Sequence, residues 1–328
     1  MRLVRSSLIV FSLITLLLAG CAKETAVTVT VNAGSDLFVQ LPADTVNLSG
    51  TVTSGQTTNV SFLWSPVTGP NTPTIANNNF ASCFINNLVA GTYVFQFQAI
   101  CNGTTATDTV TVIVLPLRTK TITIQPGLYT GQDAEAGYTP GLYDGNGASG
   151  TDPWLRIVDW TWYAVGAGEG WSRSFVKFTA LDTLPANAVI LSAKLSLYAL
   201  SDSLTIYSGF PGDSYYPGSP YNGSGPNPLW LQRCTQNWDQ TTLTWNNQPT
   251  TTTTDEVAVP ASTSQFSYNV TDLDVTQLIR DMKATPGTNY GFLMRLQNEQ
   301  FYNSMNFDAS EAKPDSSTGP KLVVTYQY

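Results

Sequence analysis

Short runs of alternating apolar and polar residues recur along the first third of the chain. In the run YVFQFQA that begins at Tyr93, the apolar residues at every second position fall on one face of an extended strand, and the two glutamines fall on the other. Comparable runs, separated by turn-rich pieces, occupy residues 26–31, 46–52, 59–64, 82–88, 91–100 and 108–115. This spacing predicts an immunoglobulin-like β-sandwich of about seven strands over residues 27–115.

The same alternation continues through residues 120–328, which we expect to form one larger all-β unit. The strand candidates there are residues 119–124, 154–162, 173–178, 189–200, 241–245, 291–297, 303–307 and 320–328.

One stretch of this second part changes period from two to about 3.6. In TDLDVTQLIRDMKATPG, Val275, Leu278, Ile279 and Met282 follow the i, i+3, i+4, i+7 spacing of an amphipathic helix. Asp274 is placed as the N-cap, and the Pro-Gly pair at 286–287 ends the helix. We therefore predict one short helix among the strands.

The first residues, MRLVRSSLIVFSLITLLLAGC, have the pattern of an export signal. A positive start is followed by an apolar stretch too short to span a bilayer as a mature helix. The ending Leu-Ala-Gly-Cys21 resembles a bacterial lipobox, which implies cleavage before Cys21 and a lipid on its sulfur; the other interpretation is an ordinary cleaved signal with a chance cysteine. We expect residues 1–20 to be the signal peptide and residues 21–26 the lipidated tether.

Charge and histidine content exclude several classes of function. Removal of residues 1–20 lowers Lys plus Arg from 15 to about 13 against 23 Asp plus Glu, so the mature chain carries about ten net negative charges. This argues against nucleic acid as a partner. The sequence has no histidine, which excludes Ser-His-Asp and Cys-His catalysis and most zinc and copper sites.

Three cysteines follow Cys21. Cys83 and Cys101 are predicted on paired strands that flank a turn near residue 90, at positions too far apart for a disulfide. We favour no bridge between them. Cys234 is interpreted as a small buried apolar residue.

Residues 27–115 resemble a PKD-type domain. The resemblance rests on VNAGSDLFVQLPADTVNLSGTV, FLWSPVTGP, LVAGTYVFQFQA and ATDTVTVIV. It implies a spacer or adhesive stalk with Trp64 in its core. Residues 116–119 are then a linker.

Residues 120–328 resemble the DNRLRE family, also described as carbohydrate-binding module family 96. The resemblance rests on TITIQPGLYTGQDAEAG, RSFVKFTALDTLPANAVILSAKLSLYAL, LWLQRCTQNWDQTTLTWNNQPTTTTTDEVAVPAS, LDVTQLIRDM, NYGFLMRLQNE and PKLVVTYQY. It implies a jelly-roll sandwich that binds polysaccharide, with polyuronate as one candidate, without cutting it. The chain departs from the family in a Gly/Pro/Tyr/Ser insert at 201–228 and in the segment after Phe307, which leaves the sugar open.

Two tryptophans of this unit, Trp238 and Trp245, lie in a Thr/Asn/Gln-rich stretch. In TTLTW, Leu243 and Trp245 share a face and the threonines take the other, as in a strand that buries its tryptophan. Both tryptophans also belong to the general pattern of the family that this part resembles, and the resemblance implies that they lie in the core and not in a sugar site.

Strand parity places several cations on the outward face of the predicted sheets. Arginine grips carboxylates through two hydrogen bonds, so one such face would suit acidic or sulfated sugar. The alternative is solvated side chains that share no surface. The candidates are Arg173, Lys177, Lys194, Arg233 and Arg295.

A second candidate site is aromatic. Sugar rings stack their C–H faces on aromatic planes, and nearby polar groups fix their orientation. Packing is an equal alternative for Trp160. The candidates share even parity in one strand-like stretch: Trp154, Arg156, Trp160 and Trp162.

Catalysis is not expected, because no spacing of carboxylates selects a pair suited to glycoside cleavage. No cofactor is expected. A structural calcium ion would find hard oxygen ligands in Asp133, Glu135 or Asp308, although no EF-hand spacing is present.

The sequence thus predicts a non-catalytic lipoprotein of the cell envelope, at the outer membrane or the cell surface, with polysaccharide as its partner. The short charged pair Lys23-Glu24 after Cys21 fits that location. The alternative is a structural or adhesive protein whose partner is another protein or the matrix. The sequence does not indicate an oligomeric state.

Overall fold

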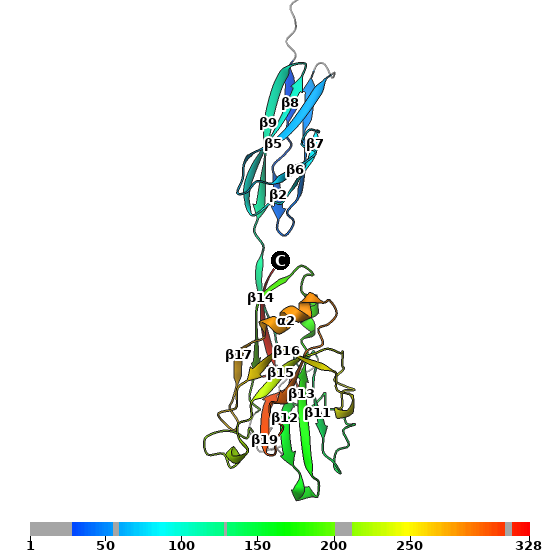
Figure 1. Cartoon of the computed structure of the whole chain (residues 1–328), viewed down its shortest axis with the longest axis vertical. Coiled ribbons are helices and arrows are strands. Elements are labelled where there is room, and N and C mark those ends of the chain that lie inside the picture. Colours follow the sequence, from blue (N-terminus) through cyan, green and yellow to red (C-terminus); the bar gives the residue numbers. More distant parts are fainter. Residues whose placement is uncertain (1–27, 55–58, 128–129, 201–211, 312–316) are drawn as a thin grey trace, which may run out of the picture. The chain divides into compact units, whose positions relative to one another are not determined.

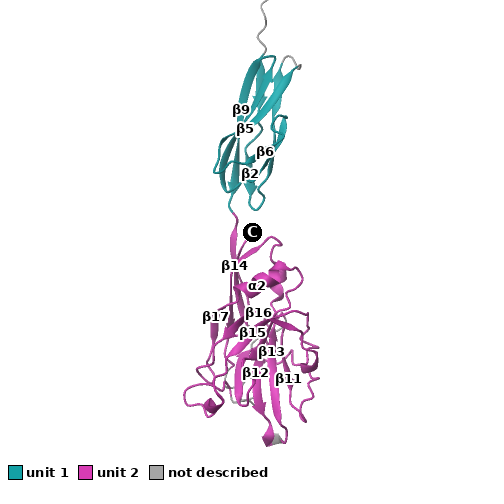
Figure 2. Ribbon diagram, in the orientation of Figure 1, with its two compact units in different colours: residues 1–116 teal, residues 117–328 magenta. Residues whose placement is uncertain are grey.

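The computed structural model describes residues 28–54, 59–127, 130–200, 212–311 and 317–328. The chain divides into two compact units between Pro116 and Leu117 (Figure 2). Both are built from strands (Figure 1), which confirms the expected all-β class with an immunoglobulin-like first part and a larger second sandwich. The predicted signal peptide, Cys21 and the tether lie outside the described residues.

The described part of the first unit contains three groups of paired strands. The larger sheet has the order β2-β9-β8-β5, a smaller sheet has the order β3-β7-β6, and β1 pairs with β4. The strands are β1 (Val29–Asn32), β2 (Leu37–Gln40), β3 (Val46–Ser49), β4 (Thr51–Ser54), β5 (Val60–Thr68), β6 (Thr74–Ala76), β7 (Ser82–Asn86), β8 (Gly91–Cys101) and β9 (Thr104–Leu115).

The predicted alternation in β8 decides what this unit buries. Tyr93, Phe95 and Phe97 point into the core beside Trp64, while the alternate residues of the strand, such as Gln96, stay half-buried. Trp64 packs on Phe97 with ring centroids 4.7 Å apart. The core role predicted for Trp64 is confirmed.

Cys83 and Cys101 are both buried and no disulfide joins them, which confirms the prediction. The reason given for it was wrong. β7 pairs with β3 and β6, and β8 pairs with β5 and β9, so the two cysteines lie in different sheets and not on paired strands.

The second unit is a sandwich of a four-stranded sheet, β10-β20-β14-β17, and a larger sheet, β16-β15-β18-β13-β12-β19, with β11 paired to β13. The strands are β10 (Thr119–Ile124), β11 (Asp133–Tyr138), β12 (Trp154–Thr161), β13 (Glu169–Val176), β14 (Val189–Leu197), β15 (Leu229–Cys234), β16 (Thr251–Val259), β17 (Val270–Asp274), β18 (Phe292–Leu296), β19 (Asn303–Asp308) and β20 (Lys321–Gln327). Four 3-10 turns and one α-helix complete the described elements: η1 (Tyr163–Val165), η2 (Thr179–Thr183), η3 (Asn222–Ser224), η4 (Trp245–Asn247) and α2 (Thr276–Ala284).

The main core of this unit combines apolar residues from both sheets, such as Leu195 and Val324 of the smaller sheet and Phe292 and Phe307 of the larger. A second, smaller cluster joins Phe175 and Leu293 to Trp238 and Leu243 of the segment that follows β15. The larger sheet therefore packs on the smaller sheet and also carries a separate apolar cluster formed with the 235–250 segment.

The helix α2 confirms the predicted helix. Val275, Leu278, Ile279 and Met282 are buried against the main core. Asp274 lies one residue before the N-cap position, yet its Oδ1 accepts a hydrogen bond of 3.0 Å from the Thr276 N–H. Among the described residues, no helix is long and apolar enough to cross a membrane.

Candidate functional site

A pocket of about 350 Å³ opens beside β11, β12, β13 and the loop that follows β11. Five aromatic side chains line it together with Arg156, Glu135 and Asp152. Volumes of this size are typical of small-ligand sites. The aromatic residues are Tyr138, Tyr143, Trp154, Trp162 and Trp171.

The loop between β11 and β12 forms one wall and is tied down by backbone hydrogen bonds. Thr139 and Tyr143 bond each other in both directions, at 2.9 and 2.7 Å. Gly145 has a φ of +79°, and a Cβ at this position would lie 3.1 Å from Trp245 and 3.2 Å from Tyr138. A side chain at this position would be strained by the left-handed backbone and would push on both rings, so glycine suits the turn and the close approach. The Asn246 N–H then bonds the Gly145 carbonyl at 3.3 Å, which joins this loop to the segment after β15.

The charges in the pocket are paired. Arg156 donates to both oxygens of Glu135, from Nε at 2.6 Å and from Nη2 at 3.0 Å, and the Ser172 hydroxyl also donates to Glu135. Glu135 is almost fully buried, with 4% of its side chain exposed. Burial and then Glu135 raise the pKa of Asp152, while Arg156 opposes the shift. Two carboxylates thus share the pocket with one guanidinium.

Three rings form a platform beside the pocket. Tyr138, Trp171 and Trp245 have centroids 6.1 to 6.5 Å apart and planes within 28° of one another. Because the three centroids are nearly equidistant, the rings spread sideways and do not form a single stack. We call Tyr138, Tyr143, Trp162, Trp171 and Trp245 the aromatic surface.

An ion-pair cluster borders this surface. The Arg173 guanidinium lies 4.8 Å from the centre of the Trp245 ring, within cation–π range. It also donates to both oxygens of Glu299, at 2.8 and 3.0 Å. Arg295 approaches the same carboxylate at 3.9 Å.

The structure therefore brings together two of the five cations predicted to share a face. Arg173 on β13 and Arg295 on β18 meet at Glu299. Lys177 bonds the Asn237 side chain at 2.9 Å, at the edge of the smaller apolar cluster.

The other two cations contradict the predicted common face. Lys194 lies on β14 in the smaller sheet and pairs with Asp274 at 2.8 Å. Arg233 lies opposite Phe292, a main-core residue, and its Nε is buried. The prediction assumed that Cys234 faces the main core, so that its neighbour Arg233 would face outward. Cys234 instead packs in the smaller cluster on the opposite face of the sheet, which leaves Arg233 on the main-core side.

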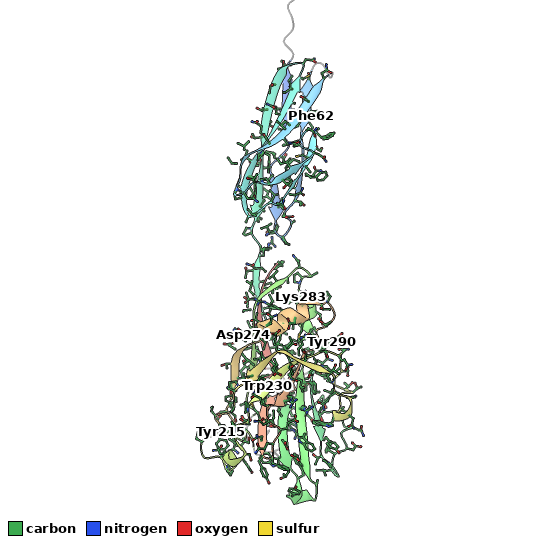
Figure 3. All side chains as sticks on the ribbon, viewed as in Figure 1. Phe62, Tyr215, Trp230, Asp274, Lys283 and Tyr290 are labelled. Atoms are coloured by element: carbon green, nitrogen blue, oxygen red, sulfur yellow. The ribbon has the colours of Figure 1, made fainter. Side chains whose placement is uncertain are left out.

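The aromatic candidates separate into two places. Arg156, Trp154 and Trp162 line the pocket, but Trp160 packs edge-on against Tyr221 and Tyr302, with centroids 4.7 and 5.2 Å away. Of the insert expected at 201–228, residues 212–228 are described by the structure, and residues 201–211 lie outside the described residues. Figure 3 labels Tyr215 there and Trp230 on β15.

The sequence assigns Trp238 and Trp245 together to the core. Trp238 is buried and donates from Nε1 to the Tyr290 carbonyl at 2.7 Å, which confirms the prediction. For Trp245 the prediction was wrong. The expected strand at 241–245 is absent, because Thr244 caps the short turn η4 through reciprocal bonds with Asn247. The Trp245 ring is left half-exposed on the aromatic surface.

Asp133, Glu135 and Asp308 are all buried, but each has contacts of its own. Asp133 accepts from the Ser310 hydroxyl and Glu135 is held by Arg156. Within the described ranges, no group of three or more histidine, cysteine or acidic side chains is arranged to hold a metal ion.

Sequence reasoning missed Tyr138, Tyr143 and Trp171 as site residues. The available signal was GYTPGLYDGNGASG at 137–150, a Gly-rich loop with two tyrosines of the kind that carries binding residues.

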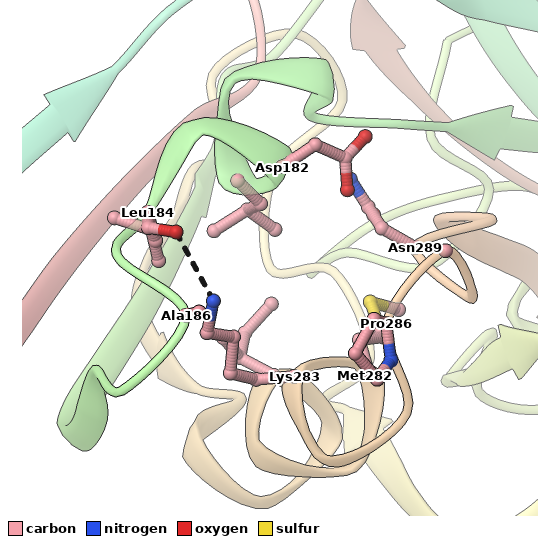
Figure 4. A pocket seen from close by; sticks show the side chains of 10 residues that line it. Asp182, Leu184, Ala186, Met282, Lys283, Pro286 and Asn289 are labelled. Atoms are coloured by element: carbon pink, nitrogen blue, oxygen red, sulfur yellow. Dashed lines mark hydrogen bonds between the residues drawn. The ribbon is translucent and has the colours of Figure 1, made fainter.

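A second pocket, of about 280 Å³, lies between α2 and η2 (Figure 4). Leu181, Leu184, Ile279 and Met282 line it, and Lys283 donates to the Leu184 carbonyl at 3.1 Å. No aromatic ring is among its lining residues, so it is less suited to stacking a sugar.

Two family models match the chain. A PKD domain model matches residues 33–114, and carbohydrate-binding module family 96 matches residues 217–326. The second match covers the C-terminal part of the second unit and includes Trp245, Arg295 and Glu299, whereas Glu135, Arg156 and Trp171 precede it. No curated protein matches the chain.

Solved structures give more distant likenesses. The PKD domain of the KIAA 1837 protein is 30% identical over 26% of this chain and 85% of that domain, with a TM-score of 0.24. SGBP-B of the Bacteroides ovatus mixed-linkage glucan utilization locus, solved with a mixed-linkage heptasaccharide, is 12% identical over 90% of this chain and 52% of its own, with a TM-score of 0.16. A SusE-like surface polysaccharide-binding protein of the Bacteroides thetaiotaomicron heparin utilisation locus is 8% identical over 88% of this chain and 59% of its own, with a TM-score of 0.21. This chain therefore spans little more than half the length of these two proteins.

Proposed function

We propose that this chain, which carries a PKD domain followed by a carbohydrate-binding module of family 96, captures polysaccharide at its aromatic surface without cutting it. The observation that carries the proposal is the placement of Trp171. This ring lines the pocket and also belongs to the platform with Tyr138 and Trp245. One sugar unit in the pocket would therefore have neighbouring units over the adjacent rings.

The chemistry of the surface suits this ligand. The C–H faces of pyranose rings pack on aromatic planes, and a few polar groups at the margin orient the hydroxyls. Arg156, Asp152 and Glu135 provide such groups inside the pocket. Exposed Tyr143, 58% accessible, lies on the Gly-rich loop at the pocket wall.

The charges favour a neutral chain over the polyuronate that the sequence suggested. The pocket holds two carboxylates against one guanidinium, and Arg156 is occupied by Glu135. Outside the pocket, Arg173 already makes both of its carboxylate bonds to Glu299. A uronate would have to displace these partners, whereas a neutral sugar would not.

The same ion pair argues against glycoside cleavage. A glycosidase needs one carboxyl as acid and a second as base or nucleophile. Glu135 accepts from Arg156 and Ser172 and is buried, so it is not placed to take either role. Asp152 then remains as a single carboxyl in the pocket, and one carboxyl does not complete the pair.

Affinity electrophoresis of the full chain tests the proposal, in gels that hold a mixed-linkage glucan, xylan, alginate or no polymer. We expect retardation by a neutral polymer, and its loss in Tyr143→Ala. The matched control is Tyr163→Ala, because this tyrosine is 68% exposed and does not line the pocket. Equal loss in both variants, or retardation by alginate alone, would contradict the proposal. Reducing ends released from a retarding polymer would contradict the non-catalytic part.

We further propose that the protein is held at the cell envelope through a lipid on Cys21, as the lipobox-like sequence indicates. Metabolic labelling with a radioactive fatty acid tests this. Label should enter the protein and should be absent from Cys21→Ala.

An adhesive role is the second candidate, and the first unit supplies the observation that favours it. Phe38, Phe80 and Phe84 are all exposed there. Single exposed apolar residues are common, so only an effect of Phe80→Ser and Phe84→Ser on cell aggregation would support adhesion.

A further inference from the structure

Three adjacent strands bring polar side chains together at one end of the larger sheet. β12 runs between β13 and β19 (Figure 1). In this register Asp159 lies opposite Trp171 on one side and opposite Asn303 on the other. Glu169, two residues before Trp171, lies opposite Thr161. Side chains of directly opposed residues project to the same face, with Cβ atoms about 5 Å apart.

Asp159 and Asn303 are buried, and the group that favours the charged form of Asp159 is the neutral Trp171 indole. Asp159 is 0% exposed and Asn303 is 1% exposed. Neither oxygen of Asp159 has a well-formed hydrogen bond to a described residue, and neither side-chain atom of Asn303 does. Buried polar groups of folded proteins nearly always have partners, and a buried carboxylate without one is costly.

Glu169 adds a second carboxylate to this place. Burial and then Glu169 raise the pKa of Asp159 to about 7, Glu299 adds to the rise, and the Trp171 indole opposes it. Glu169 is the diagonal neighbour of Asp159 across the ladder, and two neighbouring carboxylates repel each other unless a proton or a cation lies between them. Glu169 is half-exposed, so an ion would have a route from solvent.

We propose that Asp159, Glu169 and Asn303 form a binding site for a hard divalent cation, with Ca²⁺ as the ion of choice. Calcium takes six to eight oxygen ligands, and carboxylates with an amide oxygen are its usual protein donors. Backbone carbonyls and water would supply the remaining ligands. Neither the oxygen nor the nitrogen of the Asn303 amide has a hydrogen bond to a described residue, so rotating the amide by 180° breaks none. The amide can therefore point its oxygen at the ion.

This site differs from the calcium candidates in the sequence, Asp133, Glu135 and Asp308. Its distinguishing feature is a fully buried acid paired across the ladder with a fully buried amide, both with unused bonding capacity. A bound ion would also fix the β12–β13 ladder directly beneath Trp171, a ring of the aromatic surface.

The test uses the full chain freed of metal with EGTA, in the absence of sugar. Addition of Ca²⁺ should raise Tm by roughly 5–10 °C at a hundredfold excess over Kd. Terbium should bind in place of calcium and show luminescence sensitised by the neighbouring indole. Trp171→Phe should lower that luminescence, and a calcium-dependent rise in Tm should persist.

Asp159→Asn should abolish the calcium response without destabilising the metal-free protein, because it removes a buried charge. Asp152→Asn, a change of the same kind in the pocket, should retain the response. The proposal is overturned if Ca²⁺ does not raise the wild-type Tm, or if Asp159→Asn responds like the wild type. It is also overturned if only lowering the pH stabilises the metal-free protein, since a shared proton then occupies the pair. Because no sugar is present, these outcomes do not depend on the proposed polysaccharide binding.

Discussion

Replacing Arg156 with methionine would test what the guanidinium does in the pocket. The sequence suggested a ligand-binding residue, whereas the structure places Arg156 in a bidentate pair with Glu135. Methionine keeps much of the apolar stem and removes both charge-assisted hydrogen bonds. Among the described residues, the Ser172 hydroxyl is then the hydrogen-bond donor left to Glu135, a residue with 4% of its side chain exposed.

The expected cost is large because a buried charge loses its partner. Breaking a buried ion pair on one side costs about 3–5 kcal/mol, and the favourable packing of the stem does not compensate for it. For a unit of this size that loss corresponds to a decrease in Tm of roughly 6–20 °C. The double variant Glu135→Gln/Arg156→Met removes both charges, so we expect it to recover about 2 kcal/mol relative to Arg156→Met.

Thermal unfolding followed by tryptophan fluorescence is a suitable assay. Seven of the eight tryptophans lie beyond residue 117, so the signal reports mainly on the second unit. The control is Lys194→Met. Lys194 pairs with Asp274 at a comparable distance of 2.8 Å but in solvent, with 36% and 64% of the side chains exposed. An exposed pair contributes at most about 1 kcal/mol.

Two results would refute this reasoning. If Arg156→Met lowers Tm no more than Lys194→Met, then Glu135 is not effectively buried. If the double variant is less stable than Arg156→Met, the two residues are not coupled as an ion pair. Glycan retention measured on the same variants separates a structural role of Arg156 from direct contact with sugar.

Three further outcomes follow from buried groups. Burial raises the pKa of Asp213 well above its usual range, so the folded state binds the proton more tightly than the unfolded state. The free energy of unfolding should therefore fall as the pH rises above the ordinary pKa of aspartate. In Asp213→Asn this part of the pH dependence of Tm should vanish, and an unchanged dependence would contradict the argument. Burial also raises the pKa of the Cys234 thiol to about 12, so a thiol reagent at neutral pH should label it only after unfolding, and rapid labelling of the native protein would refute this. Trp238→Ala should lower the free energy of unfolding by about 3–5 kcal/mol, and Trp245→Ala should lower it much less. At a temperature where both variants are folded, only Trp245→Ala should lower glycan retention.

The sequence alone determined the type of secondary structure in both units, for a local reason. Alternation of apolar and polar residues is set by the geometry of a strand, and the spacing of Val275, Leu278, Ile279 and Met282 is set by the geometry of a helix. These patterns need no knowledge of neighbours. They predicted the all-β class and the one short helix, whereas the core roles of Trp64 and Trp238 were implied by the resemblance to known domain families.

Tertiary structure decided which side chains share a surface. Parity along one strand does not say which strands are adjacent or which face is covered, so Arg173 and Arg295 came together while Lys194 went to the other sheet and Arg233 turned inward. The larger sheet also has a second apolar cluster on its other face, and Cys234 packs there and not in the main core, so the face predicted for the residues of that strand was wrong.

The pocket depended on structure most of all. Tyr138, Tyr143 and Trp171 meet because a glycine turn at Gly145 lets one loop approach Trp245, and no periodicity encodes that approach. Asp159 and Asn303 are far apart in sequence and became a candidate ion site only through the β12–β19 register. Long-range pairing is a property of the whole sandwich, since it maximises burial over many strands at once, and a local pattern cannot specify it.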